Sequence, residues 1–146
     1  ERSCRVKAAV VAEDELEGGV RAVLNLGHTV GHAIETVLSG SEEAMPHGEC
    51  VAIGMVAEAR WAAARGDCAP DVPGEIQRVI DSLGLPSVAP VVSRTALMDA
   101  LGFDKKFHHG KLRTAIVEAV GQVRLAEIEA VEAMKMFHSI PGFRDA

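Results

Sequence analysis

Apolar residues recur every three or four positions along most of the chain, a pattern typical of amphipathic helices. In the segment that begins at Val20, for example, Val23, Leu24, Ile34 and Val37 follow this spacing. Glycine, proline and serine at the ends of such segments supply the usual start and stop signals. The helices predicted in this way span residues 3–12, 20–38, 47–65, 73–83, 93–101 and 129–139.

One stretch near the C-terminus departs from the helical period. Residues 114–120 and 123–128 are rich in Val, Ile and Leu and flank a turn at Gly121-Gln122, which predicts a β-hairpin. Their Ala and Glu content leaves a helix open as an alternative. The predicted fold class is mainly α with a small β-hairpin, as a single domain over residues 1–146.

Gly27 and Gly31 lie four positions apart inside the predicted helix 20–38. A glycine in a helix interior costs roughly 1 kcal/mol relative to alanine. We therefore expect another backbone or a ligand to approach closely at this point.

Composition and charge exclude several classes of function. The 146 residues carry 15 Lys and Arg against 21 Asp and Glu, which argues against a nucleic-acid partner. The three cysteines form no CxxC pair, so a reducing cytoplasm is expected. Charges interrupt every apolar run before it reaches the ~20 residues of a membrane helix, and no membrane association is expected. The chain begins at Glu1 rather than Met, and we expect it to be part of a longer protein.

Histidines supply the first candidate chemistry. His28 and His32 stand four apart in a predicted helix, so their imidazoles project from one face. His47 opens the next helix, and an antiparallel helix pair would bring it back towards His28. Three converging imidazoles suit zinc, which in catalytic sites takes three protein ligands and an open position. The alternative is that the HxxxH pair is merely exposed or satisfied within the core.

Basic side chains supply a second candidate chemistry, the binding of anions. Lys7, Arg21, Lys105 and Lys106 lie outside the apolar stripes. Together they would suit a pocket that binds a phosphate and a carboxylate. The alternative for each is an ordinary solvated surface residue.

Three segments carry a resemblance to a known family. Lys7-Ala8 leads to the run EGGVRAVLNLGHTVGHAIE from Glu17 to Glu35, which is followed by HGECVAIGM from His47 and by DKK at 104–106. In order and spacing these segments resemble the 3-dehydroquinate synthase family of sugar phosphate cyclases across most of the chain. The resemblance is to the helical C-terminal domain of that fold, because the family's N-terminal Rossmann-like domain, which binds NAD, has no counterpart in this sequence.

The resemblance implies a function. The family's enzymes are carbon–oxygen lyases of the shikimate pathway of aromatic amino-acid biosynthesis, and they convert 3-deoxy-D-arabino-heptulosonate 7-phosphate to 3-dehydroquinate and phosphate. It also implies zinc (or cobalt) and NAD as cofactors, a sugar phosphate substrate and a cytoplasmic homodimer. NAD would be bound mainly by the missing N-terminal domain, and the chain by itself is expected to be inactive.

Site residues carry over position by position. The resemblance makes His28 and His47 metal ligands, with a third ligand, a glutamate, in the segment that precedes this one. His32 and Glu17 match acid/base positions. The matching substrate-binding positions are Lys7, Arg21, Asn25 and one lysine of the pair Lys105 and Lys106.

The sequence departs from the family's pattern in two places, and two alternative functions stay open. The loop 36–46 is two or three residues longer than in the family, and no glycine-rich nucleotide-binding motif occurs. A sister cyclase, an aminodehydroquinate or 2-deoxy-scyllo-inosose synthase, shares the histidine motifs, although DKK at 104–106 favours dehydroquinate synthase. The other alternative is a non-catalytic helical remnant.

Overall fold

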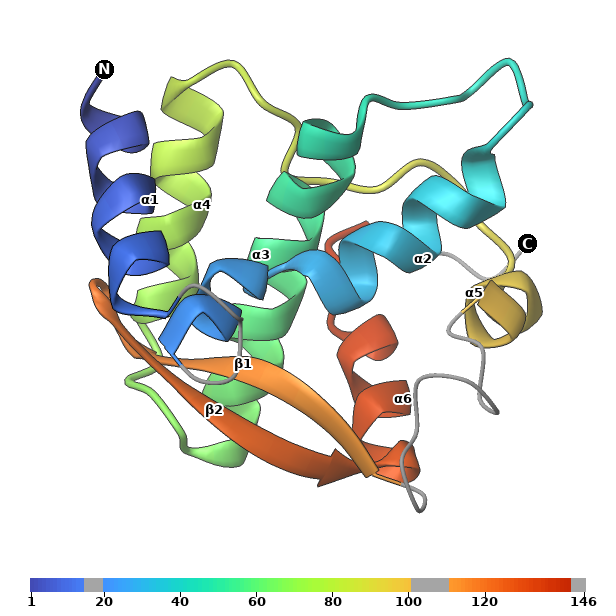
Figure 1. The fold of residues 1–146 in the computed structure, drawn as a ribbon. Helices are drawn as coiled ribbons and strands as arrows, with labels where there is room; N and C mark the ends of the chain where they lie inside the picture. The colour runs from blue at the N-terminus through green and yellow to red at the C-terminus, as the bar shows by residue number, and fades with distance from the viewer. Residues whose placement is uncertain (15–19, 101–110, 143–146) are drawn as a thin grey trace.

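The computed structural model describes residues 1–14, 20–100 and 111–142. These parts of the chain form six α-helices, one 3-10 helix and a two-stranded antiparallel sheet (Figure 1). The mainly α class with one small hairpin, predicted from the apolar pattern, is confirmed. In chain order the elements are α1 (Arg2–Glu13), η1 (Val20–Asn25), α2 (His28–Leu38), α3 (His47–Arg65), α4 (Val72–Ser82), α5 (Arg94–Ala100), β1 (Lys111–Ala119), β2 (Gln122–Glu129) and α6 (Ala130–His138).

Helix α3 is the scaffold of the fold. It contacts α2, α4, α6 and β1, and it runs through the middle of the ribbon view (Figure 1). Its buried positions lie all round its axis, as expected for a helix enclosed by others. Many of them are small, which lets neighbouring backbones come close. These positions are Cys50, Ala52, Ile53, Gly54, Val56, Ala57, Glu58, Ala59, Trp61 and Ala62.

The predicted helix 20–38 is wrong as one continuous element. The structure divides it into η1 and α2, because Gly27 adopts φ of +85° and serves as the N-cap of α2. That left-handed conformation ends one helix and lets the next start in a new direction. A Cβ on Gly27 would lie 2.6 Å from the Val51 carbonyl oxygen, and one on Gly31 would lie 2.9 Å from the Val51 Cα. The close backbone approach predicted from these two glycines is confirmed.

The remaining helices begin and end close to their predicted boundaries. Helix α3 ends at Gly66, whose φ of +81° is left-handed, and Pro73 lies in the first turn of α4. The Ser93 hydroxyl accepts a long hydrogen bond, 3.4 Å, from the Ala96 amide at the start of α5. Local capping chemistry was sufficient to predict these boundaries.

The hairpin forms as predicted, with longer strands. Its turn lies at Val120 and Gly121 rather than at Gly121-Gln122, because Gly121 takes up φ of +85°. The strands pair antiparallel, with Val117 opposite Val123. Thr114 on β1 is buried, and its hydroxyl hydrogen-bonds that of Thr29 on α2 at 3.2 Å. The hairpin is thereby attached to the first turn of α2.

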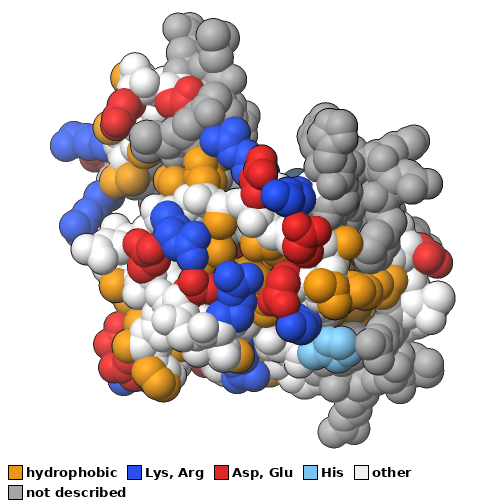
Figure 2. Space-filling model, turned by 90° about the horizontal axis from the view of Figure 1, so that it is seen from below, with side chains coloured by type: hydrophobic (Ala, Val, Ile, Leu, Met, Phe, Trp, Pro, Cys, Tyr) orange, Lys and Arg blue, Asp and Glu red, His pale blue; other side chains and the backbone are white. Residues whose placement is uncertain are grey.

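One ion pair holds the hairpin to the residues that follow α3. On β2, Arg124 pairs with Asp67 at 2.6 Å, and it also pairs within the hairpin with Glu118 on β1 at 2.9 Å. Figure 2, which views the molecule from the side where the hairpin lies, shows basic and acidic side chains interspersed on this face. Charges on this face are thus mixed rather than gathered into one basic surface.

None of the described helices is long and apolar enough to cross a membrane.

Candidate metal and substrate site

Three histidine side chains meet between α2 and the first turn of α3. His28 and His32 come from successive turns of α2, and His47 is the first residue of α3. A nitrogen of each ring lies within 4.8 Å of the others. Ring centroids are 5.2 Å apart for His28 and His32, and 5.4 Å apart for each of them with His47. The convergence predicted from the histidine spacing is confirmed. We call these three residues the histidine cluster.

The two helices that carry the cluster run in opposite directions where they touch. Gly27 at the start of α2 lies against Gly54 in the middle of α3, whereas Glu35 near the end of α2 reaches His47 at the start of α3. The two helices are therefore antiparallel, and residues later in α2 lie beside residues earlier in α3. Because glycines allow the two backbones to come this close, His47 is brought beside histidines that precede it by 15 and 19 positions.

Two of the cluster's rings bond to oxygen atoms through Nδ1. His47 Nδ1 lies 2.9 Å from the Glu35 carboxylate, and His28 Nδ1 lies 3.4 Å from the Leu26 carbonyl oxygen. Carboxylate and carbonyl oxygens only accept, so Nδ1 is the donor in both bonds, and in a neutral ring Nε2 then keeps its lone pair. The hydrogen bond from His47, together with the charges of the three rings, holds the pKa of the Glu35 carboxyl below its ordinary value.

The donor set suits a divalent transition metal. Neutral imidazole nitrogen is a preferred ligand of zinc and cobalt. A tetrahedral zinc ion with Zn–N bonds of about 2.1 Å places its nitrogens roughly 3.4 Å apart. Nitrogens already within 4.8 Å of one another reach that separation by side-chain rotation. Because His47 is exposed, such rotation is not blocked by packing.

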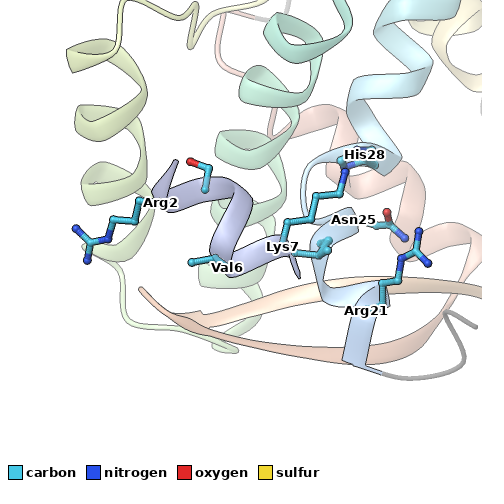
Figure 3. Close-up of a pocket in the computed structure, with 8 residues that line it drawn as sticks. Arg2, Val6, Lys7, Arg21, Asn25 and His28 are labelled. Carbon is cyan, nitrogen blue, oxygen red and sulfur yellow. The ribbon is translucent and has the colours of Figure 1, made fainter. Parts of the chain in front are cut away.

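A cavity of about 630 Å³ opens beside the cluster between α1 and η1. Figure 3 shows Lys7 extending from α1 towards His28, while Arg21 and Asn25 extend from η1 on the adjoining side. Arg2 also lines the cavity, although its side chain points away from these groups. We call this space the cationic cavity.

A second cavity of about 630 Å³ lies between α2 and the hairpin. It shares Asn25 and His28 with the cationic cavity, and His32, Thr29 and Arg113 also line it. His28, which lines both cavities, therefore stands where they adjoin. A ligand bound beside His28 is within reach of side chains from α1, η1, α2 and β1.

Not every residue singled out in the sequence can be placed. The structure brings Lys7, Arg21 and Asn25 together with the histidine cluster. Glu17, Lys105 and Lys106 lie outside the described residues, as do His108 and His109. His138 is exposed on α6.

Comparison with known proteins decides the family. A family model described as 3-dehydroquinate synthase C-terminal matches residues 1–107, a range that spans α1 to α5. The chain belongs to this family. The resemblance recognised in the sequence is confirmed.

Curated relatives agree with this assignment. The chain is 46% identical over 128 residues to a 3-dehydroquinate synthase of Synechococcus sp., covering 87% of this chain and 34% of that protein. It is 44% identical over 133 residues to the 3-dehydroquinate synthase of Geobacter sp. (strain M21), covering 91% of this chain and 36% of that protein. The chain thus spans about a third of the length of these relatives.

Solved structures share the fold. A 2-deoxy-scyllo-inosose synthase complexed with carbaglucose-6-phosphate, NAD+ and Co2+ superposes with a TM-score of 0.75 at 22% identity, covering 89% of this chain and 37% of that one. ValA is a 2-epi-5-epi-valiolone synthase from Streptomyces hygroscopicus with NAD+ and Zn2+ bound. It superposes with a TM-score of 0.74 at 20% identity, covering 95% of this chain and 38% of that one. At these identities the likeness establishes the fold alone.

This member of the 3-dehydroquinate synthase family also has a fully buried carboxyl beside the start of α2. Glu58 on α3 is 1% exposed. Its carboxylate accepts hydrogen bonds from the backbone amides of Gly27, at 2.7 Å, and Val30, at 3.2 Å. Because no side chain of α2 caps its own N-terminus, Glu58 satisfies amides that the start of a helix leaves without partners. The capping group therefore comes from the neighbouring helix.

We expect Glu58 to make stability depend on pH. Burial raises the pKa of its carboxyl from 4.5 to about 7, against the lowering effect of the backbone hydrogen bonds. The folded protein thus binds this proton more tightly than the unfolded chain. The protonated Glu58 carboxyl therefore contributes to the free energy of unfolding. This contribution is present in full below about pH 4.5 and is lost as the pH rises through 7, a change on the order of 3 kcal/mol.

Denaturant unfolding of the native protein and of Glu58→Gln, between pH 5 and pH 8, measures this effect. The native free energy of unfolding should fall relative to the variant by about 2 kcal/mol over that range. All other ionisable groups are the same in both proteins, so their contribution cancels in the difference. Parallel curves for the two proteins would show that Glu58 does not change its protonation there.

Sequence reasoning missed three polar residues of this site: Glu35, Glu58 and Arg113. Glu35 follows His28 by seven positions and His32 by three, so its place on the histidine face of α2 was open to prediction from helical periodicity. Glu58 stands among small apolar residues of a predicted helix, and because glutamate is seldom fully buried, its burial was not open to prediction from this pattern. Arg113 precedes the predicted strand 114–120, and no local pattern connects it to the histidines.

Proposed function

We propose that this chain forms the metal- and substrate-binding part of a 3-dehydroquinate synthase, which converts 3-deoxy-D-arabino-heptulosonate 7-phosphate to 3-dehydroquinate and phosphate. The observation that carries the proposal is the histidine cluster placed at the edge of a cavity lined by Lys7 and Arg21. The relatives at 44% and 46% identity that bear this name support the reaction.

The cationic cavity fits the charge of this substrate. The sugar carries a phosphate and a carboxylate, and both anions are bound best by charged nitrogen donors. Arg21 offers a planar guanidinium that can pair two oxygens at once, while Lys7 offers a mobile point charge. Asn25 adds an amide that both donates and accepts, which suits a hydroxyl of the sugar. Lys105 and Lys106 are proposed to add to this set.

His28 and His47 would hold the metal, with a third protein ligand from outside these residues. When bound, zinc or cobalt polarises the substrate hydroxyls that it contacts and lowers their pKa. NAD, held mainly by another part of the protein, supplies reversible hydride transfer. The two histidines keep Nε2 for the metal because their Nδ1 atoms donate to Glu35 and Leu26.

His32 is proposed to exchange a proton with the substrate. Its ring lies 5.2 Å from that of His28, and it also lines the second cavity. A group on that side of the metal can serve as a general acid or base at an oxygen that the metal does not hold. Glu17 is proposed to share this work.

A phosphate-release assay tests the proposal. The complete gene product that contains these residues is supplied with NAD, zinc and the seven-carbon sugar phosphate, and phosphate and 3-dehydroquinate are measured together. Formation of both, dependent on NAD and on metal, supports the proposal. Turnover of glucose 6-phosphate instead would identify a sister cyclase, and no turnover of either sugar would favour a non-catalytic remnant.

Arg21→Ala in the same protein should raise the KM for the sugar phosphate by roughly 10- to 100-fold, because a charged hydrogen bond contributes about 1.5–3 kcal/mol. Steady-state kinetics with varied substrate measure the change. Arg60→Ala is the control, because Arg60 is an exposed arginine on α3 that bonds to Gln77 instead. An unchanged KM in the Arg21 variant would remove Arg21 from the substrate site.

A further inference from the structure

Glu35 lies on the same face of α2 as the histidines of the cluster. It follows His28 by seven positions and His32 by three, and residues at these spacings line one side of a helix. One face of α2 thus presents two imidazoles of the cluster and a carboxylate that bonds to the third, at 2.9 Å from His47 Nδ1. A single helix therefore influences the position of all three rings.

The Glu35–His47 pair is poorly suited to stabilising the fold. Its side chains are 40% and 49% exposed, and exposed ion pairs contribute between nothing and about 1 kcal/mol. The bond does restrict the His47 ring. At that exposure packing leaves its two side-chain torsions loosely held, and a hydrogen bond to Nδ1 selects one tautomer and limits the rotation of the ring.

We propose that Glu35 is a positioning residue for the metal ligand His47, whose ring it orients so that Nε2 is presented to the metal. The inference rests on the proposed function of the cluster as a metal site. Metal-bound histidines commonly donate their second nitrogen to a carboxylate or carbonyl oxygen, and loss of such a partner typically weakens metal binding by about 10- to 100-fold. Nothing in this role requires Glu35 to touch the substrate.

Zinc affinity in the absence of substrate tests the proposal. The complete gene product is stripped of metal, and zinc is titrated in competition with a chromophoric chelator. Glu35→Ala should raise the Kd for zinc by about 10- to 100-fold. Glu35→Gln keeps a carbonyl oxygen that accepts from Nδ1, and it should restore most of the affinity. The melting temperature of the metal-free protein should change by no more than about 2 °C in either variant.

A control variant and the glutamine variant separate the positioning role of Glu35 from a general effect of its negative charge. Glu42→Ala removes the same charge from the exposed loop between α2 and α3 and should leave the zinc Kd within about twofold of native. Zinc affinity within twofold of native in Glu35→Ala overturns the inference. So does a glutamine variant as weak as the alanine variant, because charge alone would then explain the loss.

The same titration separates this inference from the proposed function. If His28→Ala weakens zinc binding and Glu35→Ala does not, the metal site stands and only the role of Glu35 is wrong. If neither substitution weakens zinc binding, the histidine cluster is not the metal site, and the proposed function fails together with the inference.

Discussion

Replacing His28 or His47 by alanine in the complete protein should lower NAD-dependent release of phosphate from the seven-carbon sugar phosphate by roughly a thousandfold or more. Each change removes one imidazole from a cluster whose nitrogens lie within 4.8 Å of one another. A catalytic metal contributes several kcal/mol of transition-state stabilisation, and each 1.36 kcal/mol or so corresponds to a factor of ten in rate. Phosphate release at saturating substrate, with zinc content measured on the same sample, gives the result.

His138→Ala is the matched control for these variants, because it removes an exposed imidazole from α6. It should retain near-native turnover and metal content. His108→Ala and His109→Ala, in a segment outside the described residues, are expected to behave in the same way. If His28→Ala or His47→Ala kept a tenth or more of the native rate, the altered residue would not be a ligand of the catalytic metal.

Gly54→Ala should destabilise the protein by about 3 kcal/mol or more. A Cβ at Gly54 would lie 2.0 Å from the Gly27 carbonyl oxygen and 2.9 Å from the Gly31 nitrogen. Both atoms belong to the backbone of α2 and its N-cap, so no side-chain rotation relieves the clash and the two helices have to separate. Helical propensity offsets only about 1 kcal/mol of the cost. Urea unfolding of the variant and of the native protein measures the difference.

Gly74→Ala provides the comparison. Gly74 lies in the first turn of α4, and a Cβ there would meet nothing within 4 Å. This substitution should leave stability unchanged or raise it by about 0.5–1 kcal/mol, because alanine loses less backbone entropy on folding. Equal free energies of unfolding for Gly54→Ala and the native protein would mean that α2 and α3 are not packed as closely as the structure shows.

The same clash should also disturb the cluster. Separation of α2 from α3 moves His28 and His32 away from His47, so Gly54→Ala should bind zinc more weakly even below its melting temperature. The histidine variants should instead lose metal while keeping the stability of the metal-free native protein. Comparing the two sets shows whether a loss of activity comes from a missing ligand or from a displaced helix.

Element boundaries set by neighbouring residues were open to prediction from the sequence. Gly66 ends α3 and Ser93 precedes α5 close to the positions that capping signals indicate. The division of the predicted helix 20–38 into η1 and α2 could not be predicted from the sequence, because glycine is tolerated inside helices as well as at their ends. Only the packing of Gly27 against Val51 and Gly54 decides that Gly27 adopts a left-handed conformation.

Within the site, the sequence by itself determined that His28 and His32 share a face of a helix, and it identified the family whose motifs they carry. The tertiary structure decided that the cationic cavity lies beside His28, that Glu35 bonds to His47, and that Glu58 caps the start of α2 from α3. Helical periodicity is a local property, which a short run of residues already contains. The distance between two side chains on different helices depends on how closely their backbones pack, and here glycines far apart in the chain set that distance.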